Sequence, residues 1–480
     1  MTRLNISYLI NKNKWLIVSV SLWIMIWAGY NTGIERILAP GFPASTIDLI
    51  HGLRSFLPIL AGLLAFSFLF VKRKNILKGF LLKPLGLLLL FSILGIFSSL
   101  IFSTEPLRAL YWGLMYISVL LVLLAIMNGA NGLKNLCHII RINWIIAAIL
   151  ALGLLVFFLI QFNVFENFSF NSLICSGRPY EKLAGIKAET DIFGMAGTRP
   201  TGFGRYAGIA ALVFFVFLIS RQGIISKVVW GILFFLFLLI NFFARGKAVL
   251  ASFSGSLAFT LFILKEIRIY WILLLIIVIL ASGFLILYKE PCSFFINGQL
   301  LELRESNGTA SYSLQEKSYE DGSMQQITGE KQLLINSKEL KKIATLTGRT
   351  TGVWNDSINL FFSSPVLGYG FQSDRIFLNG QHAHNSIIHA LIQTGLLGSI
   401  PFVLAFALTI ISLFYLFKNS LLDKKEKIFL IEISAVFVFI LIRSITESFT
   451  YYSADFLFLA PIIAYIELLR EEKNFSNKHE

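Results

Sequence analysis

One apolar stretch sets the fold class of this chain: Leu85-Gly86-Leu87-Leu88-Leu89-Leu90-Phe91-Ser92-Ile93-Leu94-Gly95-Ile96-Phe97-Ser98-Ser99-Leu100-Ile101-Phe102. At about 1.5 Å per residue, a helix over this uncharged stretch crosses most of the ~30 Å hydrocarbon core of a bilayer. Similar runs lie at 110–127, 145–162, 230–243 and 271–288. Only 14% of the 480 residues are charged, whereas a soluble domain carries about 25%. We therefore expect an integral membrane protein.

These runs predict an all-α polytopic membrane protein. The ~20-residue length of a membrane helix, applied along the chain, gives about twelve spans. They lie near 15–30, 52–71, 84–102, 107–126, 143–162, 203–220, 226–243, 248–264, 270–288, 395–417, 427–446 and 453–470. No small-x-small cleavage site follows the first run, so we interpret it as a span rather than as a removable signal peptide.

The longer polar segments predict the domain organisation. Residues 1–288 form a first membrane domain with an outer loop at 163–202, residues 289–394 form a large loop, and residues 395–480 form a second membrane domain with a tail. Structureless loops beyond about 15 residues are uncommon, so we expect 289–394 to be folded. Its polar stretch 306–342 is interpreted as a surface excursion.

The basic residues predict the orientation, because Lys and Arg accumulate in cytoplasmic loops. The short turns near 103–106 and 446–452 carry almost none and are assigned to the outer side. Both termini are then cytoplasmic, and 163–202 and 289–394 face outward. The inner segments hold Arg3, Lys12, Lys14, Lys72, Arg73, Lys74, Lys78, Lys83, Lys134, Arg141, Arg221, Lys227, Lys265, Arg268, Lys418, Lys424, Lys425 and Lys427.

Charge and cysteine content limit the function classes. The net charge is +14, but the basic residues are divided between many loops and form no recognition element, so nucleic acid is not expected as a partner. Cys175 and Cys292 both fall in outer segments, where an oxidising compartment would permit a bridge; two free thiols are the alternative. Cys137 is expected to be a packing residue.

The segment His382-Ala383-His384-Asn385-Ser386 is the expected place of chemistry. It brings imidazoles to the mouth of a membrane helix, where a neutral ring nitrogen can take a proton from a hydroxyl. Asn385 is expected to cap a short helix that Gly395 ends.

A second helix is expected upstream. Trp354, Ile358, Phe361 and Phe362 fall on one helical face, and Pro365 would end the helix. The amphipathic pattern is typical of a helix that lies at the membrane surface. Beyond it, Gly368 and Gly370 are expected to serve backbone geometry.

Charged residues near the outer membrane boundary form a further candidate set. Cations there contravene the orientation rule, and ionisable groups at membrane depth are costly, so a function is the default interpretation. A guanidinium group fits phosphate oxygens, which predicts a pocket for a phosphate-bearing lipid beside the histidines. The set comprises Arg199, Arg205, Arg245, Lys247, Arg443 and Glu447.

Several of these motifs together resemble the bacterial O-antigen ligase and polymerase superfamily. Its hallmark is matched by His384-Asn385, nine further residues, Gly395, two residues and Gly398. Further likenesses are Gly348-Arg349 with Trp354, Ser364-Pro365-Val366-Leu367-Gly368-Tyr369-Gly370, Arg199-Pro200-Thr201-Gly202-Phe203-Gly204, Arg245-Gly246, and the pair Arg443 and Glu447. Arg205, Lys247 and the stretch 306–342 depart from the family pattern, and these departures bear on the sugar substrate.

The resemblance implies a metal-independent glycosyltransferase without a cofactor, on a fold similar to the C-type glycosyltransferases. It would act at the periplasmic face of the bacterial inner membrane, moving an undecaprenyl-diphosphate-linked glycan onto an acceptor hydroxyl. A ligase uses a lipid A-core acceptor, a polymerase another lipid-linked repeat, and a further relative a protein hydroxyl.

The resemblance also implies roles for individual residues. His384 would be the base that activates the acceptor, and Arg199 and Arg245 would hold the donor diphosphate, with Arg349 and Arg443 as further candidates. The supporting residues would be Asn385, His382, Arg205, Lys247, Glu447, Gly368 and Gly370.

Other interpretations stay open. A transporter for lipid-linked sugars would line a cavity across the membrane midplane with charged residues, and a noncatalytic scaffold would tolerate loss of His384. Arg199 and Arg245 could simply extend to lipid headgroups or pair with Glu189, Asp191 or Glu447. No metal is expected at His382, His384 and His389, because the sequence sets no acidic or cysteine ligand convincingly beside them.

Overall fold

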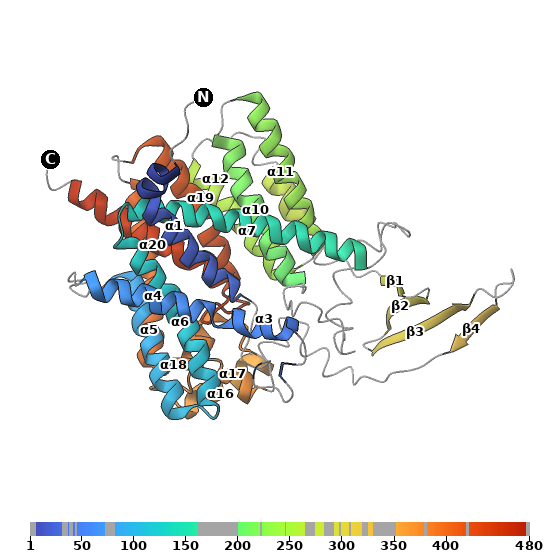
Figure 1. The fold of residues 1–480 in the computed structure, drawn as a ribbon. Coiled ribbons are helices and arrows are strands. Elements are labelled where there is room, and N and C mark those ends of the chain that lie inside the picture. The colour runs from blue at the N-terminus through green and yellow to red at the C-terminus, as the bar shows by residue number, and fades with distance from the viewer. Residues whose placement is uncertain are drawn as a thin grey trace. The chain divides into compact units, whose positions relative to one another are not determined.

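The computed structural model describes residues 6–30, 37, 42–43, 46–72, 82–161, 200–220, 223–244, 246–264, 274–282, 292–296, 299–306, 309–318, 325–329, 352–378, 382–418 and 422–476. The chain divides into two compact units, Met1–Asn143 with Val353–Glu480, and Trp144–Gly352 (Figure 1). This partition follows internal contacts, whereas the division expected from the sequence follows membrane topology.

Most described residues are helical, which confirms the expectation of a helical membrane protein. The helices are α1 (Ile6–Ala28), α3 (Thr46–Ser55), α4 (Leu57–Lys72), α5 (Pro84–Phe102), α6 (Pro106–Met127), α7 (Gly132–Gln161), α10 (Pro200–Ser220), α11 (Ile224–Ala244), α12 (Lys247–Leu264), α16 (Trp354–Ser363), α17 (Ser373–Phe377), α18 (Ser386–Lys418), α19 (Lys424–Arg443) and α20 (Ala454–Ser476).

Within the described ranges, seven helical stretches are long and apolar enough to cross a membrane. They are Asp48–Val71, Pro84–Phe102, Pro106–Met127, Gly132–Val156, Gly202–Ser220, Ile224–Phe242 and Ser386–Lys418. The apolar parts of α1 and α12 are shorter. α19 and α20 are helical where spans were expected, but they contain charged residues, among them the buried Glu432 and Glu467.

The sequence of α5 shows why these helices form and pack. Pro84 occupies the first turn, where its missing N–H costs nothing. Leu88, Phe91 and Gly95 recur at helical spacing on the buried face, whereas Phe97 on the other side is exposed, as in a helix that faces lipid. Figure 1 shows α4, α5, α6 and α18 side by side, and the pairs α5–α18, α5–α6 and α4–α6 pack directly.

The described strands between residues 292 and 329, in the first part of the expected large loop 289–394, depart from the all-α expectation. The strands β1 (Cys292–Ile296), β2 (Gln299–Ser306), β3 (Thr309–Ser318) and β4 (Gln325–Gly329) form an antiparallel sheet in the order β1-β2-β3-β4. The register pairs Cys292 with Leu303 and Leu301 with Leu314. Strand formation has a local cause, because the residues between β1 and β2 and between β2 and β3 are Asn-Gly, the strongest short hairpin signal. Cys175 lies outside the described residues.

Candidate functional site

A loop in the first unit fills a break in α18. At Gly395 the backbone leaves the helical conformation, with φ 56° and ψ −159°, as the sequence predicted for a helix that ends there. The loop at 364–370 satisfies the backbone groups that the break would leave unpaired. The bonds run from Tyr369 N to Ile392 O and from Gly370 N to Gln393 O, both 2.8 Å, and from Leu396 N to Pro365 O, also 2.8 Å.

The two glycines of this loop are required by close backbone approaches. Gly368 has φ +67° and Gly370 has φ +93°, a region that residues with a side chain rarely adopt. A Cβ on Gly368 would lie 2.5 Å from Ile392 O, and one on Gly370 would lie 2.5 Å from Ser99 Cα of α5. The loop therefore sits directly against α5 and α18. This is the backbone role expected for both glycines.

Phe371 anchors the end of this loop in the core. Its ring is fully buried, and its N–H donates to Ser99 Oγ at 2.9 Å. Gly95 leaves the space for the ring, since a Cβ there would lie 2.5 Å from it. The anchor determines where the short helix α17 begins, two residues later.

Asp374 of α17 holds the histidine segment from beneath. Its side chain is fully buried; Oδ2 accepts a hydrogen bond from Ala383 N at 3.1 Å, and Oδ1 lies 3.0 Å from His389 Nε2. Burial by itself raises the pKa of this carboxyl, but the charge and hydrogen bond of His389, the charge of His382 and the Ala383 N–H outweigh it and lower the pKa to about 2. Asp374 is therefore an anion at neutral pH.

His389 belongs to this buried support rather than to an open surface. The ring is fully buried in the first turn of α18. Its Nδ1 contacts the hydroxyls of Ser448 and Thr450, with Thr450 Oγ1 at 2.8 Å. His389 thus links α17, α18 and the loop after α19.

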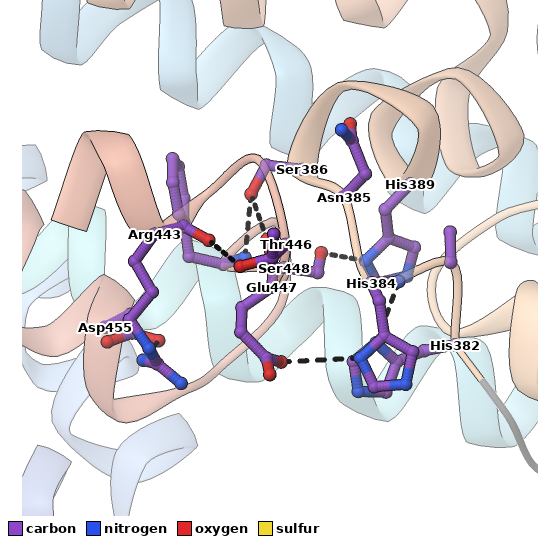
Figure 2. A network of polar contacts seen from close by, with 12 residues as sticks. His382, His384, Asn385, Ser386, His389, Arg443, Thr446, Glu447, Ser448 and Asp455 are labelled. Atoms are coloured by element: carbon purple, nitrogen blue, oxygen red, sulfur yellow. Dashed lines mark hydrogen bonds and ion pairs between the residues drawn. The ribbon is translucent and has the colours of Figure 1, made fainter. Parts of the chain in front are cut away.

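His384 lies beside Glu447 at the mouth of α18 (Figure 2). His384 Nδ1 is 3.5 Å from Glu447 Oε2, and the side chains are 24% and 15% exposed, so both remain accessible. His384 has φ +49°, which is uncommon for a residue with a side chain and indicates a backbone held by its surroundings.

Hydrogen bonds of Asn385 and Ser386 help to fix the backbone conformation at His384. Asn385 Oδ1 accepts from the N–H groups of Ile387 and Ile388, both at 3.0 Å, so Asn385 caps α18 as predicted. Its Nδ2 donates to Ile445 O at 3.1 Å. Ser386 N–H donates to Ser444 O at 3.0 Å, and Ser386 Oγ donates to Glu447 O at 3.1 Å. The start of α18 is therefore bonded to the loop that carries Glu447.

The residues of this cluster differ in the direction of their pKa shifts and therefore in their charge at neutral pH. Burial raises the pKa of Glu447, but the neighbouring His384 side chain and the charges of Arg443 and His382 outweigh it and hold that pKa well below its usual range. Burial lowers the pKa of His382 to about 3, helped by His384 and Arg375 and opposed by Glu447 and Asp374. The carboxylate is therefore ionised, and the His382 ring is neutral, near pH 7.

No metal was expected at the histidines because no acidic ligand was seen beside them in the sequence, and the structure contradicts that reason. Ligand atoms of His382, His384 and Glu447 all lie within 4.8 Å of one another. The acidic ligand that the sequence did not set beside the histidines comes from Glu447, far along the chain. Two imidazoles and a carboxylate are a donor set that zinc uses in proteins.

Arg443 forms a buried ion pair with Asp455. Its Nη1 lies 2.5 Å from Asp455 Oδ2, and the two residues are only 3% exposed. A buried guanidinium with a carboxylate partner is not an open phosphate ligand, so the geometry of Arg443 favours a structural ion pair over the expected contact with diphosphate.

Arg375 and Tyr451 lie next to the histidines, although the sequence analysis did not single them out. Arg375 Cζ is 5.7 Å from the centre of the Tyr451 ring, and the same ring is 6.2 Å from His382 and 5.8 Å from His389, between ring centres. Among the described residues, Arg375 makes no ion pair with a carboxylate, and its buried Nε has no hydrogen-bond partner. The position of Arg375 in the sequence, between the Gly370 turn and His382, could have indicated that it lies near the histidines.

The remaining basic candidates lie outside the described residues or in the second unit. Arg199, Arg245 and Arg349 lie outside the described residues. Lys247 begins α12 in the second unit. Arg205, in α10 of the same unit, is 8% exposed and stacks over the ring of Tyr206, with Cζ 4.9 Å from the ring centre.

Comparisons with protein families, with curated proteins and with solved structures found no match for this chain. The functional interpretation therefore rests on the motif residues and on the geometry of the His384 cluster. An imidazole next to a carboxylate has the arrangement of a general base and the group that orients it.

Proposed function

We propose that this protein is a membrane glycosyltransferase of the O-antigen ligase type. It moves a glycan from undecaprenyl diphosphate to an acceptor hydroxyl of lipid A-core, at the periplasmic face of the bacterial inner membrane. The observation that carries the proposal is the proximity of His384 and Glu447, 3.5 Å apart at the start of a membrane helix.

In the proposed reaction, the acceptor oxygen attacks the anomeric carbon of the donor sugar. Its proton passes to His384, and the bond from the anomeric carbon to the diphosphate oxygen breaks, so that the diphosphate leaves with the electron pair. Glu447 faces Nδ1 of His384, so it favours the tautomer with a proton on Nδ1 and a free lone pair on Nε2. It also stabilises the imidazolium that forms as the proton arrives.

The diphosphate requires positive charge where its negative charge develops. Arg199 and Arg245 keep the roles proposed from the family resemblance, with Arg349 as a further candidate. Arg375 joins them, because its half-buried guanidinium lies by the Tyr451 ring near His382. No cofactor is required by this scheme.

The proposed topology has about twelve spans with both termini in the cytoplasm. The outer segments 163–202 and 289–394 then face the periplasm. A transporter is a weaker candidate, because His384 precedes α18 and Glu447 follows α19, whereas a transport site is typical of the bilayer midplane. A polymerase of lipid-linked repeats or a protein O-oligosaccharyltransferase would use the same His384 chemistry on another acceptor.

The test measures glycan transfer by purified protein in nanodiscs, with a lipid-diphosphate donor and a lipid A-core acceptor. His384→Ala should lower the rate by about 10²- to 10⁴-fold, the usual contribution of a general base. His138→Ala is the matched control, because His138 is half-exposed and the bond shown for its ring, among the described residues, is to Lys134 O of its own helix. Full activity of a folded His384→Ala protein would remove His384 from the mechanism.

Gene deletion separates ligase from polymerase. Loss of all polymer on lipid A, with full-length polymer still on undecaprenyl diphosphate, indicates a ligase. Single repeats on the core indicate a polymerase instead.

A further inference from the structure

We propose that His382, His384 and Glu447 form a binding site for a divalent metal ion of the zinc class, and that the bound ion blocks glycan transfer. The metal site stands on geometry alone. The blocking effect rests on the proposed function, in which His384 is the base.

The distance between His384 and Glu447 is the first argument. Nδ1 and Oε2 are 3.5 Å apart, longer than the ~2.7–3.2 Å of a protein hydrogen bond. Two ligands at about 2.1 Å from a tetrahedral zinc ion are about 3.4 Å apart, which the observed separation matches. His384 Nδ1 is buried and has no hydrogen-bond partner. This nitrogen therefore faces the Glu447 carboxylate across a gap that a cation could fill.

The third ligand is close, and the site can be reached. All three ligand atoms lie within 4.8 Å of one another, so a rotation of His382 would close the set around an ion. The ring of His382 lies 3.8 Å from that of His384, between ring centres, and its Nδ1 accepts only a long 3.3 Å bond from the His384 N–H. The partial exposure of His384 and Glu447 leaves a fourth position open to water.

Charge favours a cation at this place. Within the described ranges Glu447 makes no salt bridge to Lys or Arg, because Arg443 is taken by Asp455 at 2.5 Å. Among the described residues, the ion pair shown for Glu447 is with the neighbouring imidazole, and the charge of Arg443 acts on it without a salt bridge. A dication would give this half-buried carboxylate a direct ligand contact in place of a long ion pair.

The backbone around the ligands is already held in place. Asp374 accepts from Ala383 N, between the two histidines, and Ser386 Oγ donates to the backbone oxygen of Glu447. Such outer contacts keep ligands in position before an ion arrives. The ion therefore meets a largely formed site.

The blocking effect follows from the two ring nitrogens. A metal on Nδ1 of His384 leaves Nε2 as an N–H group, which can donate but cannot accept a proton. The acceptor hydroxyl then has no base, while zinc removal returns the lone pair to Nε2.

The test begins with zinc binding to the full chain in nanodiscs, purified without a histidine tag. Equilibrium dialysis with metal analysis should find one zinc ion per chain in the wild type and in His138→Ala. Affinity should fall at least about tenfold in Glu447→Gln and in His382→Asn, two near-isosteric changes. Cobalt in place of zinc should give the absorption spectrum of a tetrahedral site. No stoichiometric zinc, or unchanged affinity in both folded variants, would overturn the site.

A transfer assay then separates the two proposals. Zinc should inhibit the wild type, and a chelator should restore the rate. If zinc binds but leaves the rate unchanged, the blocking effect is wrong. If zinc binds and no donor is ever turned over, the proposed function fails and the metal site stands. If transfer proceeds and zinc does not bind, the metal site fails and the function stands.

Discussion

Asp374 accepts a 3.1 Å hydrogen bond from the backbone N–H of Ala383, and so a fully buried carboxylate holds the peptide between His382 and His384. The same carboxylate lies 3.0 Å from His389. The residues that carry the proposed chemistry are thus positioned from one point beneath them, in a helix that the sequence analysis did not single out.

Removal of this carboxylate should therefore destabilise the fold and the site together. Asp374→Ala leaves His389 and the Ala383 N–H without their partner, and each buried polar group left unsatisfied costs about 1–3 kcal/mol. Asp374→Asn retains an acceptor for Ala383 and should cost less. Thermal unfolding in detergent measures both, and Asp356→Ala in exposed sequence is the control. Equal melting temperatures for Asp374→Ala and Asp356→Ala would contradict the assigned role.

The Arg443 to Asp455 pair predicts a structural phenotype rather than a binding one. Arg443→Ala leaves a carboxylate buried without its cation, at a cost of about 3–5 kcal/mol. Arg443→Met combined with Asp455→Leu should be more stable than Arg443→Ala, because both charges are then absent. Yield and melting temperature after purification give the comparison. A well-folded Arg443→Ala protein with only a raised KM for the donor would instead support a contact with diphosphate.

Gly370 should not tolerate a side chain. Its Cβ would lie 2.5 Å from Ser99 Cα, and its φ of +93° adds backbone strain; together these should cost about 1–3 kcal/mol or more. Gly352→Ala is the matched control, because nothing lies within 4 Å of its Cβ position. A melting temperature for Gly370→Ala as high as that of the control would show that α5 and the loop are not in contact.

His382 predicts a loss of stability in acid. Its pKa falls from 6.5 in the unfolded chain to about 3 in the fold. Below about pH 6.5 the unfolded chain takes up a proton that the folded protein refuses until about pH 3, so acid favours unfolding across that window. The melting temperature should fall less between pH 7 and pH 4 in His382→Asn than in the wild type. His138→Asn should follow the wild type, and parallel curves for all three proteins would refute the assignment.

Structural features that depend on a few neighbouring residues could be predicted from the sequence. Apolar runs produce the helices, since a chain in lipid must satisfy its backbone hydrogen bonds within each segment. Asn385 caps α18, and Gly395 breaks it, because both act on the nearest few residues. The sheet at 292–329 also had a local signal, the two Asn-Gly pairs, but no strands were predicted, and the polar stretch 306–342 was interpreted as a surface excursion.

Side-chain contacts between residues far apart in the sequence depend on how the helices pack. The residues beside His384 pointed to chemistry, yet nothing near them indicates that Glu447 completes the cluster, that Asp455 takes Arg443, or that Asp374 reaches Ala383. Periodicity and capping act over one or two helical turns, whereas a side-chain pair between helices depends on how whole faces fit together. Composition and local pattern thus determine where this chain forms apolar helices and where a helix starts, and packing alone selects which charged side chains meet.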